Sequence, residues 1–360
     1  MLLQVGSRRE ARIRPWVDAA ASGLVLTGKG ALTKAVRLRE AGFAAPLLVD
    51  EARYQLAYAT EEAPFPGLDE GPTPLFGHDR LEELMTAHLA LADAALTPTG
   101  YVAAGAADVL EAAAARVRRL GDPRVVFCAP VDAGWLYPGA LERLAEVLRS
   151  VPGPVAVLVG GRPEPQAAAA GLARLLPQVP GAGVLRTGLG AFGALGLGAG
   201  FSAFGVDSSM RQVLPPETQS RPGGGPGSPS VLFAPLMNFY LGLTLATRFS
   251  GQAPECACEC CRGGALDRFL DMAQQVPAAG HNACVLSGWA RQSHALEVAE
   301  RGPWWRGMCR SALERYPQWS QRVSHKQGFA VGAELPVWAQ LPVPEGLPGR
   351  VRGAGRGVVR

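Results

Sequence analysis

Short apolar runs alternate with amphipathic segments along residues 23–240, and this alternation constrains the fold more than any other feature of the chain. The runs are continuously apolar, as in parallel strands that are buried on both faces. Strand–helix alternation over this length predicts an α/β fold, a (β/α)8 TIM-like barrel, with an open doubly wound sheet as the alternative. The eight expected strands are residues 23–27, 46–50, 100–104, 124–130, 154–159, 183–186, 202–206 and 231–240.

In the segments between and after these runs, apolar residues recur with the spacing of an α-helix. We expect helices at residues 31–41, 80–96, 107–120, 139–150, 166–176, 189–197, 265–276, 283–299 and 304–316. The barrel should cover residues 1–250 and a zinc-binding helical subdomain residues 251–333. Residues 334–360 are rich in Pro, Gly and Arg and are expected to be poorly ordered, either as a solvated tail or as an arm that contacts phosphates.

The composition is that of a globular protein, and it says little about which kind of partner the chain binds. Hydrophobic residues make up 48% and charged residues 18%, so a sizeable core can form. The net charge of +4 permits a polyanionic partner without arguing for one. We find neither a secretory signal nor an apolar run long enough to span a membrane, and we expect a soluble, cytoplasmic protein.

Cysteine spacing predicts a metal site. Four of the seven cysteines lie within residues 256–261, whereas disulfide scaffolds spread their cysteines along a short chain. Zinc takes four sulfur or nitrogen ligands, which Cys256, Cys258, Cys261 and His281 could supply; Cys260 or Cys284 could replace one of them. Four protein ligands leave no open position, so the zinc should be structural, and Gly280 would let a helix begin at the ligand. A redox cluster and plain reactive thiols are the alternatives.

The C-x-C-x-x-C motif followed by His281-Asn282 resembles the tRNA-guanine transglycosylase family, which includes queuosine- and archaeosine-type enzymes and relatives that modify DNA. That family has a (β/α)8 barrel with a zinc subdomain. The resemblance implies a pentosyltransferase with structural Zn2+ that replaces guanine by a 7-deazaguanine base in tRNA or DNA. It therefore implies nucleic acid and a purine or 7-deazapurine base as partners, and a homodimer by analogy.

Segments of the barrel resemble the family's active site. Asp50, Tyr54 and Gln55 match an Asp followed by an aromatic residue and Gln after an early strand. Asp132 matches a base-recognising Asp at the end of a mid-barrel strand, with Tyr137-Pro138 following it. Gly160-Gly161 and residues 188–190 are both candidates for a glycine-rich turn that contacts the base. Arg186 ends a strand, where it could reach a phosphate or pair with a carboxylate.

The nucleophile segment departs most from the family pattern. The family has a Phe-Asp-Cys-Val-like segment with Arg further on, whereas this chain offers Asp207 and Arg211 at a shorter spacing. By the resemblance, Asp207 is the nucleophile that forms a covalent intermediate, Asp50 moves the proton on the purine nitrogen, and Asp132 accepts hydrogen bonds from the purine edge. The alternative is a catalytically inactive relative that binds nucleic acid or a partner protein.

Overall fold

The computed structural model describes residues 1–7, 9–69, 79–161, 164–218, 227–323 and 328–340. Eight parallel strands form one sheet in the order β3-β2-β1-β8-β7-β6-β5-β4. The end strands β3 and β4 contact each other, and isolated parallel bridges join Tyr58 to Tyr101 and Val102 to Val131, so the sheet is nearly closed into a barrel. The strands are β1 Leu2–Gly6, β2 Gly23–Thr27, β3 Leu47–Asp50, β4 Ala95–Leu96, β5 Val125–Asp132, β6 Val155–Gly160, β7 Gly183–Thr187 and β8 Ser202–Gly205.

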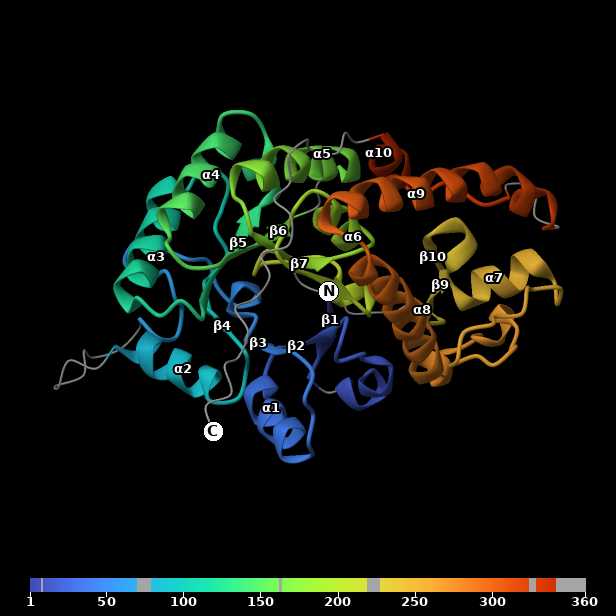
Figure 1. The fold of residues 1–360 in the computed structure, drawn as a ribbon, viewed down its shortest axis with the longest axis horizontal. Coiled ribbons are helices and arrows are strands. Elements are labelled where there is room, and N and C mark those ends of the chain that lie inside the picture. The colour runs from blue at the N-terminus through green and yellow to red at the C-terminus, as the bar shows by residue number, and fades with distance from the viewer. Residues whose placement is uncertain (8, 70–78, 162–163, 219–226, 324–327, 341–360) are drawn as a thin grey trace.

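Helices follow most of these strands and form an outer layer (Figure 1). Expected and observed bounds agree closely for all but one of the six, because each helix carries a clear apolar face. The exception is α2, which ends at Leu89 and leaves Ala95–Leu96 to form a strand. The helices are α1 Ala31–Glu40, α2 Arg80–Leu89, α3 Ala107–Leu120, α4 Ala140–Ser150, α5 Pro165–Leu175 and α6 Gly190–Gly196.

Two of the eight expected barrel strands are wrong, and one observed strand was not expected. Residues 100–104 are not a strand: Tyr101 and Val102 form isolated bridges, and Ala95–Leu96 form β4 before them. The first strand, β1, was not expected, yet it lies at the centre of the sheet between β2 and β8. Residues 231–240 are not the eighth barrel strand, because they fold into an antiparallel hairpin outside the barrel, formed by β9 (Ser230–Phe233) and β10 (Asn238–Leu241). Pro235 lies between these two strands, where its missing N–H prevents one continuous strand.

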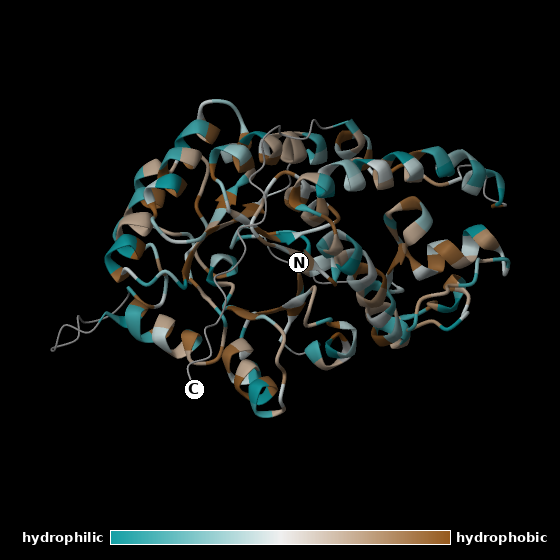
Figure 2. Cartoon of the chain, viewed as in Figure 1, coloured by the Kyte–Doolittle hydropathy of each residue, from teal (hydrophilic) through white to brown (hydrophobic). Residues whose placement is uncertain are grey.

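Apolar side chains fill the barrel and also the space between sheet and helices. Leu2, Val25, Leu48 and Leu158 belong to the cluster inside the barrel, which Val213 completes from the loop after β8. A larger cluster joins the sheet to its helices and to the helical subdomain. In Figure 2 the strands at the centre are largely brown (hydrophobic), whereas the helices around them carry both brown and teal residues.

The segment after the barrel contributes α7 (Gly242–Phe249), α8 (Gln275–Ala295) and α9 (Val298–Gln321). Residues 265–276 are not the expected helix; apart from the first two residues of α8, they form loops with two single turns, Leu266–Arg268 and Met272–Gln274. Helix α9 packs against α6, so the helical subdomain continues the outer layer of the barrel. No helix among the described residues is both long and apolar enough to cross a membrane.

The beginning of the expected disordered tail is a helix. Leu335–Gln340 form α10, which contacts α9 and α5 at the edge of the barrel (Figure 1). Trp338 supplies the anchor, because its ring lies buried against Gly193 of α6. One aromatic side chain can thus dock a segment whose composition suggests disorder. Residues 341–360, including the arginines of the proposed phosphate-contacting arm, lie outside the described residues.

Candidate metal centre and barrel-rim site

Three thiols and one imidazole gather where the loop after α7 meets α8; we call these residues the Cys–His cluster. The Sγ atoms of Cys256, Cys258 and Cys261 lie 3.5, 3.6 and 3.2 Å from His281 Nδ1. All four ligand atoms lie within 4.8 Å of one another. A tetrahedral zinc ion, with Zn–S of about 2.3 Å and Zn–N of about 2.0 Å, would separate sulfur from nitrogen by about 3.6 Å. The cluster could therefore hold a metal ion, and its donor set suits zinc.

A single tight turn presents the three cysteines. The Cys261 N–H donates to the Cys258 carbonyl over 3.0 Å, and the Gly264 N–H donates to the Cys261 carbonyl over 2.9 Å. Gly263 reverses the chain with a φ of 88°, which favours glycine. Hydrogen bonds with the other two thiols lower the pKa of Cys261, and Arg268, which donates to its Sγ over 2.8 Å, adds to this. The turn therefore favours the thiolate form of Cys261, whereas hydrogen bonds with Cys256 and Cys261 raise the pKa of Cys258.

Helix α8 supplies the fourth ligand and locks it in place. His281 Nε2 lies 2.8 Å from the Leu232 carbonyl oxygen, so Nε2 carries the proton and Nδ1 faces the thiols. The adjacent Asn282 accepts from the Leu232 N–H over 2.8 Å and donates to the Ser230 carbonyl over 2.9 Å. The cluster thereby fixes strand β9 against α8.

Gly280 has a different role from the expected one. The helix does not begin at this position, because α8 starts at Gln275 and encloses both Gly280 and His281. A Cβ at Gly280 would lie 3.1 Å from Cys260 Sγ and 3.2 Å from Trp16 Nε1, so glycine permits a close approach. Neither Cys260 nor Cys284 belongs to the cluster of described ligands.

Protonation opposes metal binding at His281. Burial lowers the pKa of His281, but hydrogen bonds with Cys256 and Cys261 outweigh burial and raise it to about 9. Without a metal, the imidazole therefore also carries a proton on Nδ1 at neutral pH and is positively charged. A bound ion must displace this proton and any remaining thiol protons, so metal binding should release acid.

A second polar cluster lies at the carboxyl ends of the barrel strands; we call Gln4, Thr27, Asp50, Tyr54 and Arg186 the rim network. Asp50 Oδ2 accepts from the Tyr54 hydroxyl over 2.7 Å, from Gln4 Nε2 over 3.0 Å and from the Thr27 hydroxyl over 3.3 Å. Asp50 is 4% exposed. Burial raises the pKa of Asp50, and the charge of Arg186 with these hydrogen bonds offsets part of the rise.

Arg186 closes the barrel above Asp50. It lies within β7, where its φ is 51°, and donates to the Tyr54 hydroxyl over 3.3 Å and to the Gln212 carbonyl over 3.1 Å. Its guanidinium also donates to the Ser209 carbonyl and, with the Gln55 amide oxygen turned toward it, to Gln55 over 2.9 and 3.0 Å. Arg186 is 3% exposed, so in this conformation its guanidinium faces protein groups rather than a phosphate.

Asp132 lies on the same rim but in its own setting. Its Oδ2 accepts from the Tyr101 hydroxyl over 2.9 Å, and its Oδ1 accepts from the Gly134 N–H over 2.8 Å. A Cβ at Gly160 would lie 2.4 Å from the Tyr101 ring, and one at Gly161 would lie 3.3 Å from Asp132 Oδ2. Both glycines of this turn therefore make room for the Tyr101–Asp132 pair.

Asp207 follows β8 and faces away from the rim network. It forms an ion pair with Arg9 at 3.0 Å, with side chains that are 13% and 38% exposed, respectively. The pair lines a cavity of about 380 Å3 between the barrel and the helical subdomain, together with Ser209, Met272 and Gln275. Two of the predicted aspartates thus end β3 and β5 and the third follows β8, all at one edge of the sheet, but each carboxylate has a separate partner.

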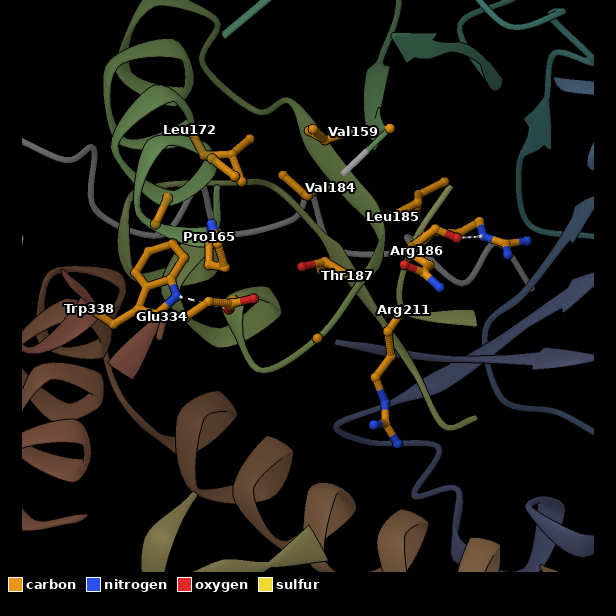
Figure 3. Close-up of a pocket in the computed structure, with 16 residues that line it drawn as sticks. Val159, Pro165, Leu172, Val184, Leu185, Arg186, Thr187, Arg211, Glu334 and Trp338 are labelled. Carbon is orange, nitrogen blue, oxygen red and sulfur yellow. Dashed lines mark hydrogen bonds between the residues drawn. The ribbon is translucent and has the colours of Figure 1, made fainter. Parts of the chain in front are cut away.

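The other candidate glycine turn lines a cavity of about 290 Å3 between α5, β7 and α10 (Figure 3). Gly188 and Gly190 form part of its wall. Glu334 accepts from Trp338 Nε1 over 3.4 Å and, in Figure 3, faces the strand that bears Thr187. Val159, Leu172 and Val184 form an apolar part of the wall, whereas Arg186, Arg211 and Gln212 line it with polar groups.

Sequence reasoning missed several residues of the rim. Gln4 is a polar residue inside the apolar run of β1, and this interruption could have marked it as a buried partner. Thr27 ends β2, as Asp50 ends β3, so both could have been expected at the same edge. Arg9 and Tyr101 carry no such signal, because only the fold brings them to Asp207 and Asp132.

Comparison of this chain with protein-family models, with curated proteins and with solved structures gives no match.

Proposed function

We propose that the protein is a base-exchange transglycosylase that replaces guanine by a 7-deazaguanine base in tRNA or DNA, and that the Cys–His cluster holds a structural Zn2+. The observation that supports this most is the position of Asp50, Asp132 and Asp207. Asp50 and Asp132 end β3 and β5, and Asp207 follows β8, so the near-closed sheet brings all three to one edge. Active sites of parallel α/β barrels form at this edge. The similarity of the zinc motif and of these segments to the transglycosylase family adds to the proposal.

The proposed reaction has two displacements at the sugar C1′. Asp207 attacks C1′, so a carboxylate–C1′ bond forms while the bond from C1′ to the guanine nitrogen breaks. Asp50 gives its proton to the leaving nitrogen. The incoming base then returns a proton to Asp50 and attacks C1′, which frees Asp207. The raised pKa of Asp50 suits this exchange, because burial makes the group bind a proton more readily than an ordinary aspartate.

The described conformation is closed, so this function requires movement. Tyr54 and Arg186 cover Asp50, and both are nearly fully buried. A base can reach Asp50 only when this contact opens. Asp132 is more accessible, and its carboxylate could accept the N–H edge of a purine once Tyr101 yields one hydrogen bond.

Incorporation of labelled guanine into bulk tRNA and into duplex DNA tests the function. We expect incorporation by the wild type and none by Asp207→Asn. Asp122→Asn is the control and should retain the wild-type rate, because this partly exposed Asp precedes β5 and lies at the opposite end of the strand from Asp132. Folded, zinc-loaded wild type that labels neither polymer would contradict the proposal.

A second candidate is a catalytically inactive relative that binds nucleic acid or a partner protein. The ion pair between Asp207 and Arg9, together with the burial of Asp50, favours it, because neither carboxylate is free to react as it stands. Mass spectrometry of the protein after incubation with polynucleotide and acid quenching separates the two. A covalent nucleotide adduct on Asp207 rules the second candidate out.

A further inference from the structure

Arg9 is a charged residue at the proposed nucleophile that no motif predicted. It lies just beyond the carboxyl end of β1, next to the end of β8, because these two strands are neighbours in the sheet. Within the described residues, Asp207 is its one ion-pair partner. The Arg9 side chain is 38% exposed and the Asp207 side chain 13%, so Arg9 is the more accessible partner for a ligand.

The cavity beside this ion pair is polar on the barrel side. Ser208 and Ser209 follow Asp207 in its wall, and Ser230 and Gln275 face them from the helical subdomain. A guanidinium binds phosphate with two parallel hydrogen bonds, as it binds a carboxylate. A phosphate at this cavity would therefore compete with Asp207 for Arg9.

We propose that the Arg9–Asp207 ion pair is a lock that a phosphate of the polynucleotide opens. This inference rests on the proposed function, because it assigns Asp207 as the group that must become free. The phosphate next to the exchanged nucleotide takes the guanidinium of Arg9, and the Asp207 carboxylate turns to the sugar C1′. Arg9 is then a positioning residue, which makes the nucleophile available only when a polyanion is bound.

Binding of fluorescent bulk tRNA and duplex DNA, measured by anisotropy at several salt concentrations, tests this lock without requiring any base exchange. We expect Asp207→Asn to bind roughly two- to fivefold more tightly, because Arg9 no longer has a competing carboxylate. Arg9→Ala should bind more weakly and lower the slope of log affinity against log salt by about 0.7 to 0.9, the effect of one phosphate contact. In the Arg9→Ala background, Asp207→Asn should give no gain.

Arg14→Ala is the matched control, since Arg14 is an exposed arginine of the same segment outside the cavity. Equal unfolding midpoints of all variants show that the fold is intact. The lock is wrong if Arg9→Ala and Arg14→Ala weaken binding equally, or if Asp207→Asn still tightens binding in the Arg9→Ala background. Neither outcome bears on base exchange, which the guanine-incorporation assay tests separately. If the expected pattern appears without guanine incorporation, the lock stands and the proposed activity fails. Wild type that binds neither polymer overturns both.

Discussion

The Cys–His cluster and the rim network are both groups of partly or fully buried polar residues, but the chain assembles them differently. Three ligands of the cluster come from one turn of six residues, and the fourth lies on the next helix. The rim network draws on β1, β2, β3 and β7, and the hydrogen bond from the Arg186 N–H to Gln4 Oε1 joins residues 182 positions apart. Local spacing can therefore reveal the first, whereas the second exists only after the barrel closes.

The two sites also differ in how their charges are balanced. Thiolates of the Cys–His cluster need a cation, and the positions of the four ligand atoms suit a metal ion. The rim network balances Asp50 with the Arg186 guanidinium and with hydroxyl and amide donors from within the chain. Removing one ligand should therefore release an ion, whereas removing one rim residue should leave a buried group without its partner.

The largest expected effect belongs to the Cys–His cluster. Cys258→Ser should lose its metal and much of the structure around α8, because structural zinc sites contribute roughly 10–16 kcal/mol of apparent binding free energy. Elemental analysis and thermal unfolding measure this. Cys260→Ser is the matched control from the same turn and should keep one metal per chain. A well-folded wild type that contains no metal would contradict the prediction that the Cys–His cluster, unlike the rim network, needs a bound ion.

Arg186→Met tests the rim network at its charged centre. The change leaves Asp50 buried without its cation, so we expect the free energy of unfolding to fall by about 3–5 kcal/mol. Urea denaturation measures this loss. Arg124→Met, at an exposed arginine paired with Asp122, should change stability by about 0.5 kcal/mol or less. Equal effects of the two changes would mean that the rim network is not a structural unit.

Gly160→Ala tests the packing beneath Asp132. The added methyl would meet the Tyr101 ring at 2.4 Å, so the ring must move and the hydrogen bond to Asp132 should break. We expect a loss of about 1–3 kcal/mol in urea denaturation. Gly6→Ala, where nothing lies within 4 Å of the added methyl, is the control and should be nearly neutral. A Gly160→Ala protein with the same free energy of unfolding as wild type would contradict the close contact between Gly160 and the Tyr101 ring.

The smallest effect is a pH dependence that comes from Asp50. Its pKa is raised in the folded protein above the ordinary value of 3.8, so the folded state binds the proton more tightly than the unfolded state. This contribution to stability is complete below that value and is lost as pH rises toward the folded pKa, by at most about 1.4 kcal/mol per pH unit. Urea denaturation at increasing pH from about pH 4, just above the ordinary pKa, should show a steeper decline for wild type than for Asp50→Asn. Parallel curves would exclude Asp50 as the source.

The sequence by itself determined the α/β class of the fold and the group of residues that could hold a metal ion. Continuous apolar runs such as residues 154–159 became strands, and the helix over residues 107–120 has the expected bounds, because hydrophobic spacing and helix propensity act locally. The four residues predicted as ligands also come together, since Cys256, Cys258, Cys261 and His281 form a group that could hold a metal ion, and neither Cys260 nor Cys284 belongs to it. Spacing within one turn limits which thiols can meet.

Only the tertiary structure decided which strands make the barrel and what each rim residue contacts. Residues 2–6 form a central strand that was not expected, and residues 230–241 form a hairpin outside the barrel. Strand pairing depends on neighbours far away in the chain, which local patterns do not specify. The same holds for the rim. Asp50, Asp132 and Asp207 were all expected at strand ends, but their partners Arg186, Tyr101 and Arg9 come from other strands and loops. Closing the sheet sets these contacts, and no local spacing in the chain encodes them.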